Sequence, residues 1–247
     1  MGNKQKSKNA PKFSIVIPCY NEEKVIEKTL DKIDEWYKKQ DFEIEVLAVD
    51  NNSSDRTMEM IGEKIKKRDY ISILVEKCQG KGCAVRNGML IANGEYILFM
   101  DADNSTDISH MDKMWSFFKK GYDVVIGSIE VPGAEVYEET GWYKRLFGHW
   151  SKLLIRLIAL PGIYDSQRGF KCFTKKAVYD IFSKQRIEKW GFDIEILAIA
   201  RKLGYKIKEM PVKWVNVGKS EVKPSAYIKT LLELFQIKWN LITGKYK

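Results

Sequence analysis

The chain has 247 residues, of which 45% are hydrophobic and 30% charged, with six prolines and seventeen glycines. This length suits one globular domain, and the composition excludes a wholly disordered chain and a collagen-like repeat. Lysine and arginine exceed aspartate and glutamate by nine (42 against 33). The surplus favours an anionic partner: a phosphate compound, a membrane surface or nucleic acid.

The cysteines are scattered, at Cys19, Cys78, Cys83 and Cys172, and there are two histidines. Because no CxxC pair is present, we predict free thiols in a reducing compartment and no zinc site. Residues 1–12 are polar and basic, and we expect a flexible tail there. No segment reaches the ~20 mostly uncharged residues that span a bilayer.

Apolar runs alternate with helix-period segments between Phe13 and Gly127. Asn21 is expected to cap the first helix, with Ile26, Leu30 and Ile33 on its buried face. Strands are predicted over 13–17, 44–49, 71–75, 96–100 and 124–127. This order predicts an α/β fold with a mostly parallel sheet and helices on both faces. Ligands of such sheets bind at the carboxyl ends of the strands.

Residues 128–141 are acidic and irregular, and we expect a mobile loop there. An amphipathic helix is predicted over 142–160, and a second amphipathic segment over 225–243. On the first, Trp142 and Trp150 share an apolar arc opposite Arg145, Lys152 and Arg156. Such a helix either lies on a membrane surface or packs on the protein core.

Asp101 and Asp103 follow a buried strand, one residue apart. Carboxylates are ligands for Mg²⁺ or Mn²⁺, and an ion there would neutralise a departing diphosphate. An isolated pair could equally belong to a solvated loop or cap a helix, but its place at a strand end favours a site.

Asp50 ends another strand and could accept hydrogen bonds from a nucleobase or a ribose, or belong to an ordinary turn. Lys81 and Arg86 surround a helix start where phosphate could bind. The loop lacks the GxxxxGK[ST] pattern, which excludes a P-loop ATPase.

The segment Asp165–Lys171 places Arg168 and Lys171 beside a glycine, which suits an anionic acceptor. Asp193 and Glu195 begin a later helix and are either partners of its dipole or site residues.

Taken together, these motifs resemble the family-two inverting glycosyltransferases of GT-A fold. The closer likeness is to the dolichyl-phosphate and polyprenyl-phosphate sugar synthases, and the Gln-x-Gly-Phe-Lys form is most like the dolichyl-phosphate glucosyltransferases. The matching pieces, in the family's order, are Ile17–Glu22, Val49–Asp55, Lys81–Gly88, Asp101–Asp103, Asp165–Lys171 and Trp190–Glu195.

The resemblance implies a nucleotide-sugar donor, with a UDP-sugar favoured over GDP-mannose, and Mg²⁺ or Mn²⁺ as cofactor. It implies that Pro18, Tyr20, Glu22 and Asp50 hold the base and ribose. Lys81, Arg86, Asp101, Ala102 and Asp103 would serve the diphosphate and the metal, and Ser128, Arg168 and Lys171 the acceptor phosphate. Catalytic roles would fall to Asp103, Arg168, Lys171 and Asp193.

The chain departs from the family pattern at Ile129, where an arginine often follows the Gly-Ser that ends strand five. We predict that Arg168 supplies the missing cation. The expected organisation is a tail over 1–12, a catalytic domain over 13–224 and an amphipathic segment over 225–247. Within the domain, residues 13–127 would form the nucleotide-sugar half and 128–224 the acceptor half, with an interfacial helix over about 142–160.

The expected reaction is a single displacement in which a polyprenyl phosphate oxygen attacks the anomeric carbon, at the cytoplasmic face of a membrane. A hydroxyl acceptor would need a base, for which Asp193 or Glu195 is the candidate. The alternative from another class is a non-enzymatic basic protein that binds membranes. Nothing in the sequence resembles an RNA-recognition motif or a zinc finger, so nucleic acid is not an expected partner.

Overall fold

The computed structural model describes residues 12–137, 142–215 and 224–247, without the side chains of 142–147, 149 and 224–228. The predicted tail therefore lies outside the described residues except for Lys12. The strands are β1 (Phe13–Cys19), β2 (Ile44–Asp50), β3 (Ile71–Val75), β4 (Tyr96–Met100), β5 (Val124–Ser128), β6 (Glu135–Tyr137), β7 (Phe170–Thr174), β8 (Ile207–Pro211) and β9 (Lys213–Val215). The helices are α1 (Ile26–Tyr37), α2 (Thr57–Ile65), α3 (Lys81–Ile91), the 3₁₀ turn η1 (Ile108–His110), α4 (Met111–Lys119), α5 (Trp142–Ile158), α6 (Lys175–Phe182), α7 (Phe192–Lys202) and α8 (Pro224–Ile242).

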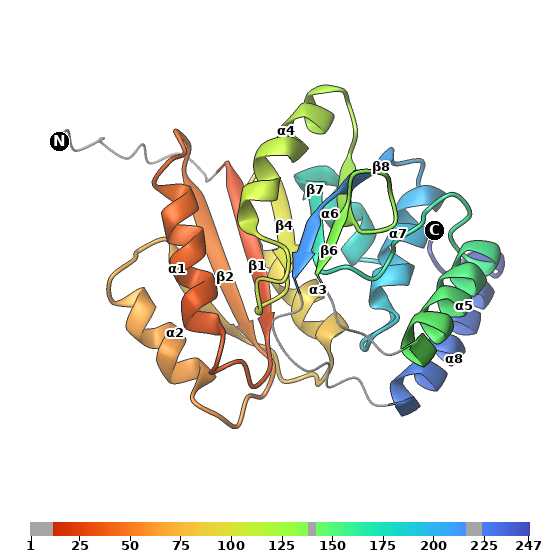
Figure 1. The fold of residues 1–247 in the computed structure, drawn as a ribbon, viewed down its shortest axis with the longest axis horizontal. Coiled ribbons are helices and arrows are strands. Elements are labelled where there is room, and N and C mark those ends of the chain that lie inside the picture. Colours follow the sequence, from red (N-terminus) through yellow and green to blue (C-terminus); the bar gives the residue numbers. More distant parts are fainter. Residues whose placement is uncertain (1–11, 138–141, 216–223) are drawn as a thin grey trace.

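Seven strands form the central sheet in the order β3-β2-β1-β4-β7-β5-β8 (Figure 1). β1 to β4 are parallel to one another, β7 runs antiparallel to both of its neighbours, and β8 is parallel to β5. The prediction of a mostly parallel α/β sheet is thus confirmed. β6 and β9 form a separate two-stranded parallel sheet.

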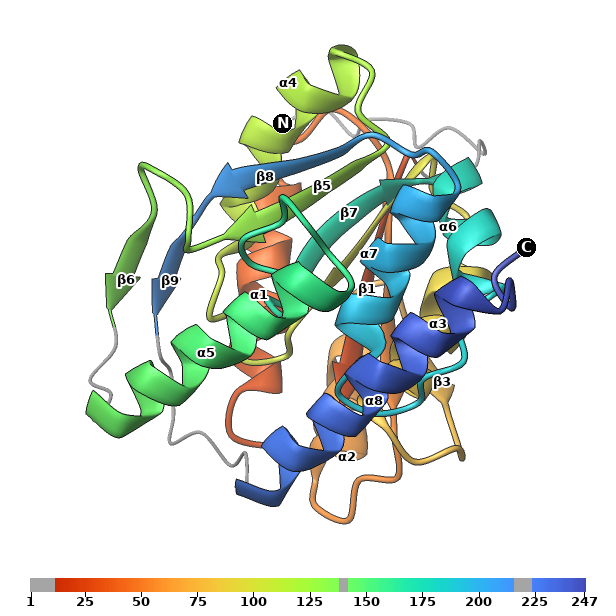
Figure 2. The same ribbon diagram turned by 90° about the vertical axis from the view of Figure 1, so that its right-hand side faces the viewer.

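Helices cover both faces of the sheet, as an alternating strand-helix order requires. All seven residues of β1 are buried, because a parallel strand at the centre of such a sheet has cores on both sides. Phe13, Ile15 and Ile17 pack into the core under α1 and α4, whereas Val16 faces the core under α3. α8 packs outside α7, and α5 lies beside α8 (Figure 2).

Two local predictions are wrong. α1 begins at Ile26 and not beside Asn21, because Asn21 adopts a left-handed backbone (φ 56°) and its side chain accepts a hydrogen bond from the Ser54 N–H (2.8 Å). The segment 128–141 is not wholly a loop, since it contains β6; residues 138–141 lie outside the described residues.

The prediction for the cysteines is half correct. Cys19 and Cys172 are free and buried. Cys78 and Cys83 form a disulfide, since the first turn of α3 brings Cys83 back beside the loop that carries Cys78. Their spacing in the sequence did not resemble a metal motif and gave no sign of this pairing.

Within the described residues, no helix has both the length and the apolar composition needed to cross a bilayer.

Asp34 on α1 ties this helix to the segment before β3. Burial alone would raise the pKa of its carboxyl, but hydrogen bonds from Lys38, Tyr70 (2.6 Å) and Arg68 lower that pKa to about 2. The stabilisation is therefore full above the unfolded pKa near 3.8 and is lost as the pH falls toward 2. We expect Asp34→Asn to reduce the free energy of unfolding by about 2 kcal/mol at pH 7.

Urea unfolding at pH 7 and across pH 5 to 2 measures this effect. The loss of stability toward pH 2 should be shallower in Asp34→Asn than in the wild type. Glu59→Gln, which removes an exposed partner of Arg56, is the control and should change little. Equal pH slopes for the wild type and Asp34→Asn would contradict the assignment.

Candidate active site

Polar residues follow the carboxyl ends of three parallel strands at one edge of the sheet. The register of β1 and β2 sets Cys19 opposite Asp50, and β4 ends one residue before Asp101. Because β1 lies between the other two strands, the ends of β2 and β4 are ~10 Å apart by ordinary strand spacing. Asp50 and the Asp101–Asp103 segment thus share one edge.

Asp50 has an acceptor atom that the protein leaves unused. The side chain is 4% exposed; Oδ2 accepts a hydrogen bond from the Ser53 N–H (3.3 Å), while Oδ1 is buried with no partner among the described residues. A buried acceptor without a donor costs about 1–3 kcal/mol, which an N–H or O–H of a ligand would recover. Pro18 is buried in β1 opposite Val49, the residue before Asp50, and Tyr20 is 51% exposed at the same strand end.

Lys81 and Asp101 form an ion pair at the start of α3, with Nζ 2.6 Å from Oδ1. Both side chains keep partial exposure, and Nζ also lies 5.7 Å from the ring centroid of Trp190. Gly169 packs against Asp101 so closely that a Cβ there would lie 2.1 Å from Oδ1. A side chain at this position would displace the Asp101 carboxylate, which gives a reason for the glycine in the Asp165–Lys171 motif.

Asp103 belongs to a turn whose backbone is fixed from both sides. Its Oδ1 accepts the Ser105 N–H (2.9 Å), and the Ala102 carbonyl accepts the Thr29 hydroxyl (2.6 Å). Asn104 has φ 53°, and its buried Oδ1 has no partner among the described residues. Oxygen donors of this kind, at least one of them unsatisfied, fit a hard divalent cation, which Asp101 and Asp103 would hold.

Asp193, at the start of α7, forms a buried ion pair with Lys171 on β7. Lys171 is fully buried, donates also to the Arg168 carbonyl, and lies 5.1 Å from the ring centroid of Phe99. Burial raises the pKa of Asp193, and the charges of Lys171 and Lys81 oppose that rise. Lys171 is therefore a charge partner of Asp193, which corrects its expected direct contact with an acceptor phosphate.

Arg168 lies over the ring of Trp214, with Cζ 4.3 Å from the centroid, and keeps 22% of its side chain exposed. Its Nε is 3.4 Å from Asp165 Oδ2, and the same oxygen accepts the Ile129 N–H (3.0 Å). The Arg168 side chain therefore sits beside the position where the family arginine is missing. Trp214 forms a β-bridge with Thr106, three residues after Asp103, so the tryptophan under Arg168 is attached to the segment that follows the Asp103 turn.

Two predicted roles do not fit the structure. Ser128 is fully buried and its Oγ accepts the Glu130 N–H (3.2 Å), so it is not accessible to an acceptor phosphate. Glu195 is also fully buried; Oε2 accepts the N–H groups of Arg186 and Ile187, and Oε1 accepts the Tyr246 hydroxyl (2.6 Å). Glu195 is a structural anchor and not a base.

For Glu22 and Arg86, the roles that the resemblance implied stay predictions. The Glu22 N–H donates to Thr57 Oγ1 (2.8 Å), which fixes the backbone after β1. Arg86 is exposed on α3 and makes no hydrogen bond or ion pair with Asp101 or Asp103 in the described part of the chain.

Asn51 is a site residue that the sequence analysis did not single out. Its Nδ2 donates to the carbonyls of Glu76 and Cys78, and its Oδ1 accepts the Gly80 N–H (2.8 Å). It thereby fixes the loop that carries Lys81 to the strand end that carries Asp50. Its place directly after Asp50 was the one available signal.

Comparison with known proteins gives a family match and a fold match. The family model described as "Glycosyl transferase family 2" matches residues 14–182. A dolichyl-phosphate beta-glucosyltransferase of Trichomonas vaginalis is 34% identical, over 91% of this chain and 70% of its own length. The human dolichyl-phosphate beta-glucosyltransferase is 29% identical, over 95% of this chain and 77% of its own length.

Among solved structures, glucosyl-3-phosphoglycerate synthase from Mycobacterium tuberculosis, in complex with Mn²⁺, UDP-glucose and phosphoglyceric acid, superposes with a TM-score of 0.71. The two chains are 15% identical, and the match covers 92% of this chain and 80% of that one. This likeness supports the GT-A fold. The resemblance drawn from the sequence motifs is confirmed, and the alternative of a non-enzymatic basic protein is wrong.

Proposed function

Because the chain belongs to glycosyl transferase family 2 and is a hexosyltransferase, we propose that it transfers glucose from UDP-glucose to a dolichyl-type polyprenyl phosphate, with inversion. The relatives named for this reaction support the sugar and the acceptor. The observation that carries the proposal is the row of groups along one sheet edge: the unused Asp50 oxygen, the Lys81–Asp101 pair and the cationic Arg168.

The donor fits the part of this row that runs from Asp50 to the Asp101–Asp103 segment. Asp50 Oδ1 would accept a hydrogen bond from an N–H of the uracil or a ribose hydroxyl. Lys81 would face the diphosphate, and its side chain keeps 21% exposure beside the partly exposed Asp101. Asp101 and Asp103 would hold a divalent cation, whose charge would stabilise the diphosphate as it leaves. The fold neighbour holds Mn²⁺ with UDP-glucose, which supports this choice.

The acceptor fits the other end. A phosphate monoester is anionic near neutral pH, so one of its oxygens can attack the anomeric carbon without a base. The new carbon–oxygen bond forms as the bond to UDP breaks, and the configuration inverts. Positioning and charge complementarity then supply most of the barrier reduction. Asp193 is already paired with Lys171 and Glu195 is an anchor, so neither residue supports a hydroxyl acceptor that needs a base.

Purified protein with Mg²⁺ or Mn²⁺, labelled UDP- and GDP-hexoses and polyprenyl phosphate, followed by lipid extraction, tests the proposal. We expect label in the lipid phase from UDP-glucose, and none without a divalent cation. Product with a sugar hydroxyl or a peptide only would contradict the acceptor assignment. Product from GDP-mannose only would contradict the donor.

Arg168 is proposed to bind the acceptor phosphate. We expect Arg168→Ala to raise the KM for polyprenyl phosphate by about 10- to 100-fold, because a charge-assisted hydrogen bond is worth about 1.5–3 kcal/mol. The KM for UDP-glucose should stay within a factor of about two. Lys208→Ala removes another cation that lies over an aromatic ring and is the control. An unchanged acceptor KM would refute the role.

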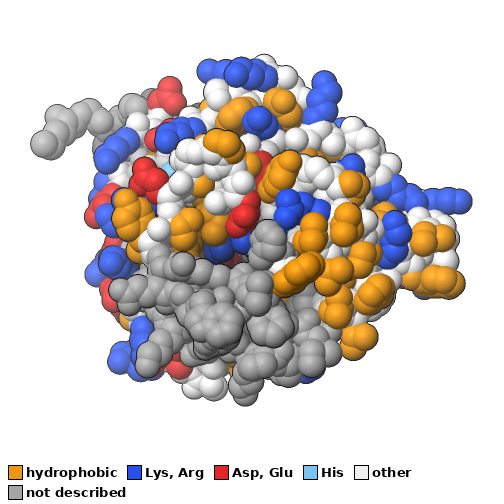
Figure 3. Space-filling model, turned by 45° about the vertical axis from the view of Figure 1, so that its right-hand side comes forward, with side chains coloured by type: hydrophobic (Ala, Val, Ile, Leu, Met, Phe, Trp, Pro, Cys, Tyr) orange, Lys and Arg blue, Asp and Glu red, His pale blue; other side chains and the backbone are white. Residues whose placement is uncertain are grey.

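The proposal includes a membrane surface formed by α5 and α8, which pack side by side. Large apolar side chains on this surface are exposed: Trp150, Leu154, Leu157, Leu231, Leu232, Phe235, Trp239 and Ile242. Figure 3 shows hydrophobic side chains gathered on this side of the molecule, with lysines and arginines beside them. This pattern is typical of helices that lie in the membrane interface.

The roles predicted for Lys152 and Arg156 at this surface stay predictions. Lys152 pairs with Glu130, and Arg156 lies over the Tyr164 ring (5.2 Å). The side chains of Trp142 and Arg145 lie outside the described residues.

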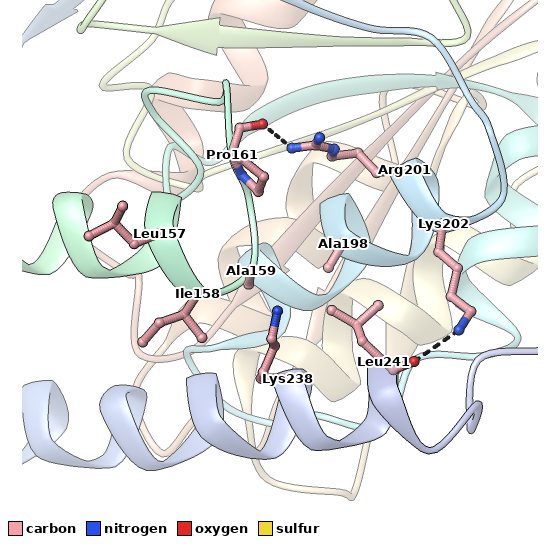
Figure 4. A pocket seen from close by; sticks show the side chains of 9 residues that line it. All are labelled: Leu157, Ile158, Ala159, Pro161, Ala198, Arg201, Lys202, Lys238 and Leu241. Carbon is pink, nitrogen blue, oxygen red and sulfur yellow. Dashed lines mark hydrogen bonds between the residues drawn. The ribbon is translucent and has the colours of Figure 1, made fainter.

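A groove between the ends of α5, α7 and α8, of about 320 Å³, has Arg201, Lys202 and Lys238 on an otherwise apolar wall (Figure 4). Arg201 and Lys202 donate to backbone carbonyls, and no acidic residue lines the groove in the described chain. These charges suit anionic headgroups. We assign this surface to the cytoplasmic leaflet as part of the proposal.

Vesicle co-sedimentation tests this surface. We expect the double variant Leu232→Glu, Phe235→Glu to bind vesicles of mixed neutral and anionic lipid at least roughly tenfold more weakly. The reason is that moving two apolar side chains from water into the lipid contributes several kcal/mol to the binding free energy. Tyr179→Glu on α6, an equally exposed aromatic outside the surface, is the control. Equal binding by both variants would show that α8 does not face the lipid.

A further inference from the structure

The loop between β3 and α3 is closed by the disulfide between Cys78 and Cys83. The two Cα atoms are 6.0 Å apart, within the range of about 4.4–6.8 Å that a disulfide bridges without backbone movement. Cys78 is partly exposed, Cys83 is 8% exposed, and the free Cys19 and Cys172 are buried. Cys78 is thus the cysteine of this chain whose sulfur atom a reagent in solution can reach.

This loop contains the lysine that meets the donor. Lys81 lies between the two cysteines, and its Nζ is 2.6 Å from Asp101 Oδ1. The Cys78 carbonyl accepts Asn51 Nδ2 (2.7 Å), and the Cys83 N–H donates to the Glu188 carbonyl (3.2 Å). The loop is therefore attached at one end to the strand end of Asp50 and at the other to the segment before α7.

Close packing leaves the loop few other conformations while it is closed. Gly80 has φ 153°, and a Cβ on Gly80 or Gly82 would lie 2.2–2.6 Å from the carbonyl oxygens of Glu188 or Ile187. The disulfide joins the two ends of this packed segment. Opening it removes the one covalent constraint on the backbone that positions Lys81.

We propose that Cys78 and Cys83 are a reversible thiol modification site that sets the affinity for the nucleotide-sugar donor. The closed disulfide is the form with Lys81 in place, and the reduced form binds donor more weakly. This inference rests on the proposed function for the identity of the donor, but not for the position of Lys81.

The chemistry is thiol–disulfide exchange with a dithiol. A thiolate of the reductant attacks the accessible Cys78 Sγ, the Sγ–Sγ bond breaks, and Cys83 leaves as a thiolate that takes up a proton. The second thiol of the reductant then displaces Cys78. The protein gains two electrons and two protons, and the reductant becomes a disulfide. A carboxylate of Glu188 lies within 4.8 Å of both sulfur atoms. Its negative charge disfavours thiolates there, which favours the closed form.

The expected effect follows from the cost of ordering the opened loop. Fixing one residue's backbone costs about 1–2 kcal/mol, so re-ordering the Lys81 segment should weaken UDP binding by about 5- to 30-fold.

The experiment uses the full chain equilibrated with oxidised or with reduced dithiothreitol, with intact mass to show the gain of two hydrogens. The affinity for UDP is measured by titration in the presence of Mg²⁺. In the absence of nucleotide, the acylation of Lys81 by an amine-reactive reagent is followed by peptide mass. We expect weaker UDP binding and faster acylation of Lys81 in the reduced form. Cys78→Ser should behave as the reduced form under both conditions, and because Cys78 is partly exposed this variant should fold.

Equal UDP affinity and equal acylation of Lys81 in both redox states would overturn the proposal. So would a wild-type chain whose mass does not change, or one purified with stoichiometric zinc on Cys78, Cys83 and Glu188. If UDP binds in neither state, the proposed donor is wrong, and the acylation of Lys81 still decides whether the disulfide controls the loop.

Discussion

Replacing Asp103 with asparagine is expected to lower kcat/KM for UDP-glucose by about 10²- to 10³-fold, the cost of removing one group that stabilises developing charge. Asparagine keeps an oxygen that can accept the Ser105 N–H, so the turn should stay intact and only the negative charge is lost. The loss should therefore appear in turnover and in cation dependence, while the free energy of unfolding without ligand changes little.

Two measurements test this prediction: steady-state kinetics over a range of Mn²⁺ concentrations, and thermal unfolding with and without UDP and Mn²⁺. Asp107→Asn is a matched control, because Asp107 lies on the same loop and accepts a backbone N–H two residues later, from Ser109 (2.9 Å). We expect this control to keep its activity and its stabilisation by UDP. Full activity of Asp103→Asn would exclude Asp103 from the cation site.

The strands that carry the donor site were predictable because their patterns are local. β1, β2 and β4 are short apolar runs, each followed by polar residues, and the parallel arrangement then dictates that these residues meet at one edge. Asp50, Asp101 and Asp103 could be placed together from this rule alone. Predicting that these three residues lie close together required no information on long-range packing.

β7 could not be predicted in this way, because it is a buried strand whose sequence contains a charged residue. It is a central strand whose second residue is a lysine, and the carboxylate that balances the Lys171 charge is that of Asp193, 22 residues further on. From the sequence, the same lysine was expected to face an acceptor phosphate. β8 was missed for a related reason: it is the edge strand, and Lys208, Glu209 and Pro211 obscure its apolar pattern.

Glu195 shows the same limit at the site itself. It stands two residues after Asp193 in the first turn of α7, so the sequence gives both the same local description. Their side chains nevertheless point to different partners, Asp193 to Lys171 and Glu195 to Tyr246 and the 186–187 backbone. The different roles of Asp193 and Glu195 follow from the packing of α8 and the C-terminal turn against α7, which the sequence does not reveal.

The buried pair of Lys171 and Asp193 leads to the largest expected effect on stability. Lys171→Met should reduce the free energy of unfolding by about 3–5 kcal/mol, because it leaves the Asp193 carboxylate buried without its counter-charge. The double variant Lys171→Met, Asp193→Leu should recover most of that loss, since it replaces both charges with apolar groups. It should nevertheless remain inactive, because it removes the Asp193 carboxylate that interacts with Lys81 at the donor site.

Urea unfolding at pH 7, analysed with the slope of each transition, measures these values. Lys176→Met is the control, because Lys176 and Asp180 form an ion pair with side-chain exposures of 79% and 36%, and its removal should have little effect. If Lys171→Met cost no more than that surface variant, Asp193 would have another counter-charge or access to water. If instead the double variant were both stable and active, the pair would serve the fold alone, and the acceptor phosphate would depend on Arg168 without help from the charges beneath it.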